Sequence, residues 1–163
     1  RLPVPEKNTV DLNHTAAELL EFVRSEMDLA KVKTRLDLDP APTPARVDPN
    51  QIRAALLNLL RNAREAMPEG GHIVMRIRSL SNQVFVEVTD SGGGISQDVR
   101  DRLYEPFFST KAQGTGLGLS MVKQIVDAHE GSIEVESKAS AGTTFRLIFA
   151  SASANQNIES VET

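Results

Sequence analysis

The sequence predicts an α+β two-layer sandwich, in which helices cover one face of a mixed, mainly antiparallel sheet. Strand-like segments with alternating apolar residues occur in pairs joined by short turns, as in antiparallel hairpins. The helix-like segments carry an apolar stripe on one side only, so each can cover one face of a sheet. These two observations together favour a two-layer arrangement.

Length and composition predict one globular domain. The chain has 163 residues, of which 40% are hydrophobic and 25% charged, which is enough apolar material for one core. We expect this domain to occupy residues 1–150. Residues 151–163 lack an apolar pattern and are expected to form a disordered tail. The chain begins with arginine instead of methionine, so we expect a soluble piece cut from a longer protein.

Charge and the absence of cysteine argue against several classes of function. The formal net charge of −4 gives no basic surface field, so nucleic acid is not expected as a partner. The lack of cysteine excludes disulfides and thiolate metal sites. No apolar run approaches the roughly 18 residues of a membrane span, so we expect no direct membrane insertion of this fragment and a cytoplasmic location.

A helix and a short strand are predicted first along the chain. Thr15 and Glu18 form a capping box that starts a helix. Apolar residues at helical spacing continue from there to about Lys31. Leu36 and Leu38 then alternate with charged residues, which is typical of a short strand.

A second helix follows a proline-rich loop, residues 40–44. Asp48 is a good N-cap and Pro49 suits the first helical position, so this helix is predicted over residues 49–67. Its apolar stripe consists of Ile52, Leu56, Leu59, Leu60, Ala63 and Met67.

The second half of the chain predicts two hairpins with two helices between them. The hairpin strands are residues 72–79 with 83–90, and residues 132–137 with 143–150. The first hairpin has one apolar face, made of Ile73, Met75, Ile77, Val84, Val86 and Val88. The helices are residues 96–104 and 117–129, separated by residues 105–113 without regular structure.

Three glycines occur where the last helix begins. The stretch QGTGLGLSMVKQIV has glycine at positions 114, 116 and 118, although each glycine weakens a helical turn by about 0.5–1 kcal/mol relative to alanine. The spacing fits neither a P-loop nor a dinucleotide-binding fingerprint. Bare backbone at a helix start nevertheless lets N–H groups approach an anion, which the helix dipole favours. This pattern is consistent with a local phosphate site.

Two asparagines lie beside the apolar stripe of the second helix. Asn58 and Asn62 are four residues apart and share a flank of the helix with Glu65. Asparagine is a poor residue for a helix interior, so two of them at the edge of the core need interaction partners. Their amide oxygens suit a magnesium ion that already sits on phosphates. A pair of solvated asparagines is the simpler alternative.

A third unusual stretch ends the first hairpin. Asp90 is followed by serine, three glycines and Ile95. An aspartate before glycines is common in tight turns. An aspartate at a strand end beside bare backbone can also accept a hydrogen bond from an exocyclic amine while a base lies close to the backbone.

The order and spacing of the motifs resemble one known family. NLLRNAREA, DSGGGI, EPFFSTK, GTGLGLS and AGTTF follow one another as in the ATP-binding domain of sensor histidine kinases, part of the superfamily that includes gyrase, heat-shock chaperone and mismatch-repair ATPases. The resemblance covers about residues 48–150. It implies the Bergerat-type ATP-binding fold, with ATP and Mg²⁺ as cofactors.

The resemblance implies roles for individual residues. Asn62 would hold the metal with help from Asn58, and Asp90 would accept from the adenine amino group. Lys111 would contact the terminal phosphates, and with the two asparagines it forms the predicted catalytic set. The residues that the resemblance assigns to ATP binding are Asn58, Asn62, Asp90, Gly92, Gly94, Ile95, Phe108, Thr110, Lys111, Gly114, Thr115, Gly116, Leu117, Gly118, Leu119 and Thr143.

The residues from Phe107 to Lys111 match the phenylalanine box of the mobile lid in that family. The resemblance implies that the three glycines let this lid fold over the triphosphate and present N–H donors at the helix start. Leu117 and Leu119 would pack beside the nucleotide. In the simpler alternative, the phenylalanines are core residues and Lys111 is solvated.

One departure from the wider superfamily concerns the reaction. Members that hydrolyse ATP place a glutamate, as general base, where this chain has Asn58, and an amide cannot take a proton from water. The resemblance therefore implies phosphoryl transfer to a separate acceptor.

The acceptor itself is not expected in this chain. Kinases of this kind phosphorylate a histidine in a His-Glu motif on a helical hairpin. His14 and His72 lack the following glutamate, and His129 precedes one but ends a helix. The resemblance thus implies the catalytic domain of a protein histidine kinase, which transfers the γ-phosphoryl group of Mg-ATP to a histidine of a separate dimerisation domain, for relay to an aspartate in the receiver domain of a response regulator.

Two other classes of function remain open from the sequence. One is an ATPase or an anti-sigma-type serine kinase on the same fold, against which Asn58 argues. The other is a nucleotide-sensing interaction module that binds ATP without transferring it.

Overall fold

The computed structural model describes residues 2–106, 108, 118–138 and 140–152. Its helices are α1 (Leu12–Leu29), α2 (Pro49–Glu65), α3 (Gln97–Arg100) and α4 (Gly118–Ala128). Its strands are β1 (Asn8–Asp11), β2 (Val32–Asp37), β3 (Pro44–Val47), β4 (Gly71–Leu80), β5 (Gln83–Asp90), β6 (Ser132–Ser137) and β7 (Thr143–Ala150).

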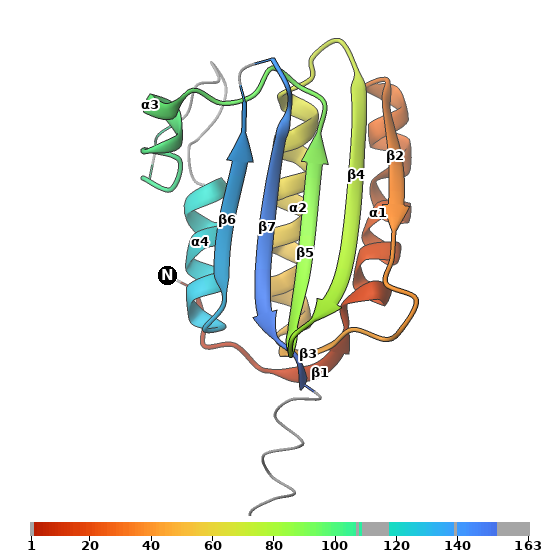
Figure 1. Ribbon diagram of the computed structural model, residues 1–163, viewed down its shortest axis with the longest axis vertical. Helices are drawn as coiled ribbons and strands as arrows, with labels where there is room; N and C mark the ends of the chain where they lie inside the picture. The colour runs from red at the N-terminus through yellow and green to blue at the C-terminus, as the bar shows by residue number, and fades with distance from the viewer. Residues whose placement is uncertain (1, 107, 109–117, 139, 153–163) are drawn as a thin grey trace, which may run out of the picture.

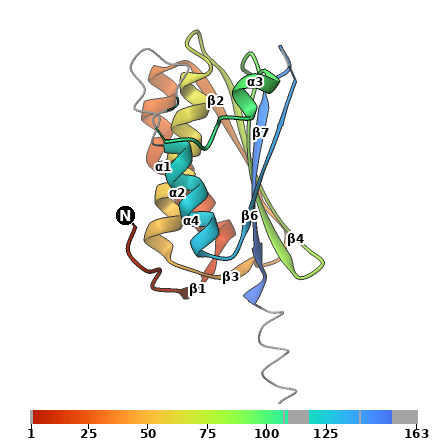
Figure 2. The ribbon, with the colours of Figure 1, turned by 90° about the vertical axis from the view of Figure 1, so that its left-hand side faces the viewer.

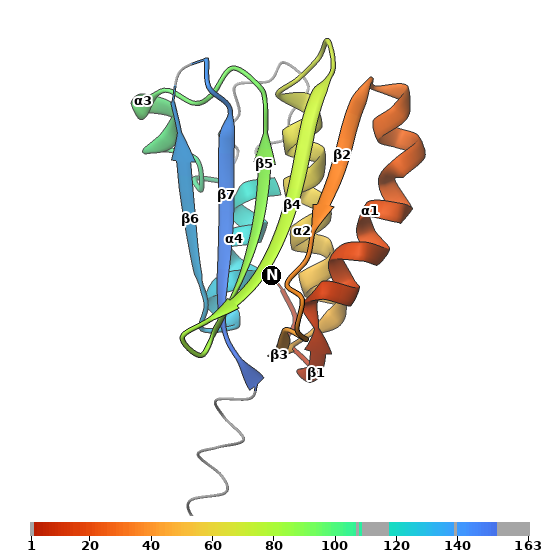
Figure 3. The same ribbon diagram turned by 45° about the vertical axis from the view of Figure 1, so that its right-hand side comes forward.

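These elements form a sheet layer and a helix layer (Figure 1). The five-stranded sheet has the order β2-β4-β5-β7-β6, in which β2 and β4 are parallel and all other neighbours are antiparallel. The helices α1, α2 and α4 lie on one face of the sheet (Figure 2), with α1 beside the edge strand β2 (Figure 3). The predicted α+β two-layer sandwich with a mixed, mainly antiparallel sheet is therefore confirmed.

The core lies between the two layers and follows the predicted apolar pattern. The six predicted stripe residues are buried, although α2 ends at Glu65 and Met67 lies just beyond it. The six apolar residues predicted for one face of the first hairpin are buried too. The first hairpin turns through Ser81 and Asn82, which both have positive φ, between the paired residues Leu80 and Gln83. A two-residue turn of this kind suits the right-handed twist of the flanking strands.

Helix α2 begins as predicted. The Asp48 side chain accepts hydrogen bonds from the backbone N–H groups of Asn50 at 3.0 Å and Gln51 at 3.1 Å, and Pro49 occupies the first turn. The same carboxylate accepts from the N–H of Glu6 at 2.8 Å, so the N-terminal segment is fastened to the start of α2.

Helix α1 begins earlier than the sequence predicted. Asp11 is its N-cap, and the Asp11 side chain accepts from the N–H of Asn13 and from both the N–H and the hydroxyl of Thr43. Thr15 lies inside the helix, where its hydroxyl approaches the Asp11 carbonyl at 3.5 Å. The predicted capping box was wrong because Thr43, distant in sequence, completes the cap at Asp11.

Four smaller differences from the predicted elements concern short segments. The strands β1 and β3 have four residues each and pair with each other, and the sequence did not predict them. Strand β2 begins at Val32 and ends before Leu38. Helix α3 is shorter than predicted, and the chain continues from it through turns and a bend to residue 106. Ser151 and Ala152 are buried, and Ser151 pairs with Ala45, so these two residues belong to the folded domain.

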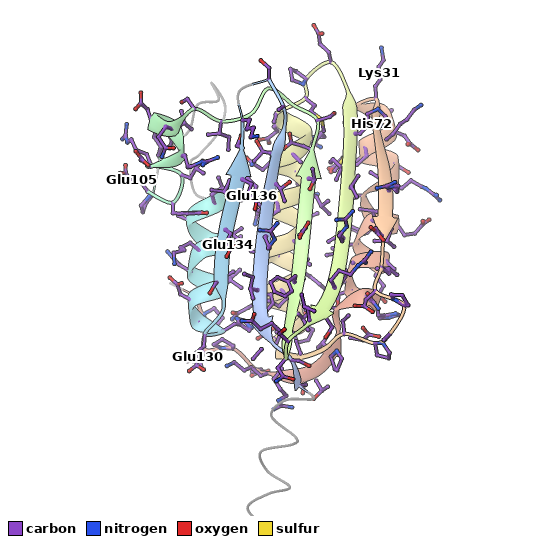
Figure 4. All side chains as sticks on the ribbon, in the orientation of Figure 1. Lys31, His72, Glu105, Glu130, Glu134 and Glu136 are labelled. Atoms are coloured by element: carbon purple, nitrogen blue, oxygen red, sulfur yellow. The ribbon has the colours of Figure 1, made fainter. Side chains whose placement is uncertain are left out.

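The open face of the sheet carries one row of alternating charges across all five strands. In register order, the row consists of Asp37, Arg76, Glu87, Arg146 and Glu134. Arg146, the fourth residue of the row, pairs with three carboxylates, at nitrogen to oxygen distances of 3.0 Å to Glu87, 2.9 Å to Glu134 and 3.0 Å to Glu136. Figure 4 shows Glu134 and Glu136 on this face. The charges of this row are thus paired with one another.

Candidate functional site

The candidate site lies at one end of the sheet, where β5 ends and β7 begins (Figure 1). Asp90 and Thr143 are paired across the two strands there. Val88 is a core residue, so Asp90, two positions further along β5, lies on the same helix-covered face. Beyond Asp90 the chain leaves the sheet through the loop of residues 91–95.

The Asp90 side chain is buried beneath this loop. The residue is 7% exposed, and its Oδ1 accepts a hydrogen bond from the N–H of Gly92 at 2.8 Å. Burial raises the pKa of Asp90, and the backbone N–H groups of Gly92 and Thr143 offset only part of that rise. The site therefore holds a desolvated carboxylate, whose remaining lone pairs can accept a hydrogen bond from a donor such as an amine.

Both glycines predicted to line the site are required by close approach. A Cβ on Gly92 would lie 2.8 Å from the Ala66 carbonyl oxygen and 3.0 Å from Asp90 Oδ1. Gly94 has φ +78°, and a Cβ there would collide with the carbonyl oxygen of Lys138. The loop thus packs between the end of α2 and the turn after β6. It brings bare backbone beside the Asp90 carboxylate.

The two asparagines lie on α2, one turn apart, and both are partly buried. Asn58 donates from Nδ2 to the Ala54 carbonyl at 2.9 Å, which fixes its amide. Its Oδ1 faces the start of α4, since a Cβ on Gly118 would lie 3.5 Å from that oxygen. The structure therefore brings Asn58 to the helix start that contains the last of the three glycines.

The remaining predicted site residues divide into two groups. Leu119 and Ile95 are partly buried and pack against the core, and Phe108 lies with its ring 4.5 Å from the Arg102 guanidinium. The other predicted lid and glycine-motif residues lie outside the described residues: Phe107, Ser109, Thr110, Lys111, Gly114, Thr115, Gly116 and Leu117.

Sequence reasoning missed Ser137, which ends β6 next to the site. Its Oγ accepts from the N–H of Ile95 at 2.6 Å and lies 3.0 Å from Thr143 Oγ1. A serine at the end of a strand carries no distinctive sequence signal, because the contact depends on how the loop after β5 meets the β6–β7 turn. The residue could not have been found without the fold.

The two asparagines fit a magnesium ion that takes most of its ligands from water and substrate phosphates. In the described ranges, no three His, Asp or Glu side chains cluster in a way that could hold a metal ion. Asn58 and Asn62 offer neutral amide oxygens on one flank of α2. Magnesium commonly keeps several waters and binds substrate phosphates, so it needs few protein ligands.

Comparison with known proteins agrees with the geometry. Residues 47–153 match the family described as histidine kinase-, DNA gyrase B- and HSP90-like ATPases. The sensor histidine kinase ZraS of Escherichia coli (strain K12) is 37% identical over 138 residues, which are 85% of this chain and 30% of that protein. The chain spans 18% of the length of another curated relative, sporulation kinase E of Bacillus subtilis (strain 168).

Solved structures show the same architecture. The nucleotide-free catalytic domain of the histidine kinase ThkA superposes with a TM-score of 0.82 and 30% sequence identity, covering 90% of this chain and 96% of that one. ThkA in complex with the response regulator protein TrrA gives a TM-score of 0.78 at 27% identity, covering 91% of this chain and 42% of that one.

Proposed function

Because the chain belongs to the family of histidine kinase-, DNA gyrase B- and HSP90-like ATPases, we propose that it is the catalytic domain of a sensor histidine kinase. The domain binds Mg-ATP and directs its γ-phosphoryl group to a histidine on the dimerisation domain of the same kinase. The observation that carries this proposal is the buried Asp90 carboxylate at the end of β5, with the bare backbone of Gly92 beside it.

The proposed adenine pocket uses Asp90 as acceptor for the exocyclic amine. The backbone at Gly92 and Gly94 leaves room for the base, and Ile95 and Thr143 line the pocket beside it. A charge-assisted hydrogen bond in a desolvated site is stronger than one at a surface, which supports Asp90 as the specificity group.

The proposed phosphate end uses α2 and the start of α4. Asn62, with Asn58, would hold Mg²⁺ through amide oxygens, and the N–H groups at the start of α4 would face the phosphates. Bound Mg²⁺ would neutralise phosphate charge as it develops. Lys111 and the glycines at 114 and 116 stay sequence-based assignments to this end of the site.

Transfer to a separate histidine fits the residues better than hydrolysis does. Asn58 holds its amide against the Ala54 carbonyl and cannot take a proton from water. His129 is buried, and its Nε2 accepts a hydrogen bond from the N–H of Asp48. Its ring is therefore not available to receive a phosphoryl group. The protein would then act by positioning and electrostatics, and the nucleophile would come from the dimerisation domain.

The proposed second partner is the receiver domain of a response regulator. The ThkA structure with TrrA contains such a regulator bound to a kinase with the same catalytic fold. For this chain, the phosphoryl group would pass from the acceptor histidine to an aspartate of that domain.

The test is phosphoryl transfer from γ-labelled ATP to a separately purified dimerisation domain of a relative. We expect label on the acceptor that is lost in acid and kept in base, as for a phosphohistidine, and no label when the acceptor histidine is changed to alanine. The Asn62→Ala variant should lose transfer, and Ser132→Ala, on the exposed start of β6, should keep it.

The same assay measures release of inorganic phosphate without any acceptor. Acceptor-free turnover as fast as transfer would favour the ATPase alternative. Tight nucleotide binding with neither reaction would favour a nucleotide-sensing module. Either result would contradict the proposed kinase activity.

A further inference from the structure

We propose that Ser137 is a positioning residue of the nucleotide pocket, which fixes the Ile95 backbone and the Thr143 hydroxyl in place. This inference rests on the proposed function. Ser137 is the last residue of β6 and is partly buried, and its hydroxyl lies between the loop after β5 and the start of β7.

The Ser137 hydroxyl makes three contacts at once. Its Oγ accepts from the N–H of Ile95 at 2.6 Å, lies 3.2 Å from the carbonyl oxygen of Gly142, and lies 3.0 Å from Thr143 Oγ1. A serine hydroxyl has one hydrogen to donate and two lone pairs to accept with. All three contacts are hydrogen bonds only if Ser137 donates to Gly142 and accepts from Ile95 and Thr143.

This assignment determines what Thr143 can offer a ligand. The Thr143 hydroxyl gives its one hydrogen to Ser137, so its oxygen is left as an acceptor. Thr143 is 5% exposed and is paired with Asp90, whose carboxylate is an acceptor too. Two adjacent acceptors favour a ligand edge that donates, such as an exocyclic amine, over one that presents a carbonyl oxygen.

Other contacts join the same two segments. The N–H of Ser140 donates to the Gly93 carbonyl at 2.7 Å, and Nη2 of Arg100 donates to the Ser137 carbonyl at 2.7 Å. A Cβ on Gly142 would collide with the carbonyl oxygen of Asp90. The loop after β5 and the β6–β7 turn therefore pack against each other. Among the described hydrogen bonds, Ser137 Oγ is the only side-chain hydroxyl that accepts from the Ile95 N–H.

The role of Ser137 is tested with three variants of the whole chain. Ser137→Ala removes the hydroxyl, Ser137→Thr keeps it, and Ser132→Ala removes an exposed serine from the other end of the same strand. For each variant we would measure the Kd of a non-hydrolysable ATP analogue by calorimetry, the Tm, and the hydrogen-exchange rate of the Ile95 amide by NMR.

We expect Ser137→Ala to weaken binding of the analogue by about tenfold, the effect of one partly buried hydrogen bond. The Ile95 amide should exchange faster in that variant, and Ser137→Thr should restore both values. Ser132→Ala should match the wild type. Unchanged affinity in Ser137→Ala, with binding intact in the wild type, would overturn the inference alone.

Two further outcomes also count against it. A large fall in Tm together with lost affinity, not restored by threonine, would show that Ser137 only maintains the fold. Absence of binding by the wild-type chain would overturn the proposed function and this inference together, so the two failures are distinguishable.

Discussion

At the scale of single residues, Asp90 occupies a buried position that costs stability when its carboxylate is charged. Its carboxylate is desolvated, and its pKa is raised because burial outweighs the two backbone N–H groups that stabilise the charge. A carboxylate with a raised pKa binds its proton more tightly in the folded chain than in the unfolded chain. Its contribution to stability is therefore largest in acid and is lost as the pH rises through its pKa in the folded chain.

The variant Asp90→Asn tests this balance. At neutral pH the neutral amide avoids the cost of a buried charge and can still accept from the N–H of Gly92, so we expect Tm to rise by about 2–4 °C, the change that 1 kcal/mol produces at this chain length. Binding of an ATP analogue should weaken in the same variant, because a neutral amide oxygen replaces the charged acceptor.

The sign of the effect is checked by its pH dependence. The stability difference between Asp90→Asn and the wild type should shrink as the pH falls through the raised pKa of Asp90, because the wild-type carboxyl then also becomes neutral. Thermal unfolding of both proteins from pH 7 to pH 4 measures this. A difference that is constant over that range would mean that Asp90 is not the titrating group.

At the scale of elements, α2 and α4 are joined through one histidine. His129, after the end of α4, donates from Nδ1 to the Ile125 carbonyl at 2.7 Å and accepts at Nε2 from the N–H of Asp48 at 3.0 Å. This pair of bonds requires the neutral imidazole with its proton on Nδ1. The N-cap of α2 is therefore held by α4, whose other end faces Asn58.

The variant His129→Phe tests this link. Phenylalanine keeps a ring beside Phe149, which His129 meets edge-on at a centroid distance of 6.2 Å, but leaves the Asp48 N–H without a partner. We expect the free energy of unfolding to fall by about 1–3 kcal/mol, the effect of one buried unsatisfied donor. Denaturant unfolding at constant m-value checks this, and an unchanged midpoint would contradict it.

The charged row on the open face makes a second prediction at this scale. Removing Arg146 leaves Glu87, Glu134 and Glu136 close together without their shared cation. We expect Arg146→Met to lower the free energy of unfolding by about 1 kcal/mol at low salt and by less at high salt.

The matched control for that prediction is Arg35→Met. Arg35 is exposed on β2, and the described residues provide no ion pair for it. Its variant should have the stability of the wild type at both salt concentrations. An equal loss in the two variants would show that the three-carboxylate arrangement around Arg146 adds nothing.

At the scale of the whole molecule, the sequence predicted those elements that local signals determine. Asp48 and Pro49 start α2 through their own backbone chemistry, and the alternation in β4 and β5 fixes which residues face the helices. Asn58 and Asp90, which the sequence assigned to the site, therefore lie on the predicted elements, on α2 and at the end of β5.

The parts that the sequence did not predict depend on contacts between distant segments. The cap of α1 needs Thr43, and the pairing of β1 with β3 involves only four residues on each side. Ser137 meets Ile95 across 42 positions of sequence.

No helix in the described part of the chain has the length and apolar character to cross a membrane.

Calorimetric titration of the chain with a non-hydrolysable ATP analogue, with and without magnesium, is the decisive experiment for the proposed nucleotide site. We predict magnesium-dependent binding that Asn62→Ala abolishes and that Asp90→Ala weakens by about tenfold to more than a hundredfold, the loss of about 1.5–3 kcal/mol for one charge-assisted hydrogen bond. An affinity that neither magnesium nor the two substitutions change, or no binding at all, would contradict the proposed nucleotide site.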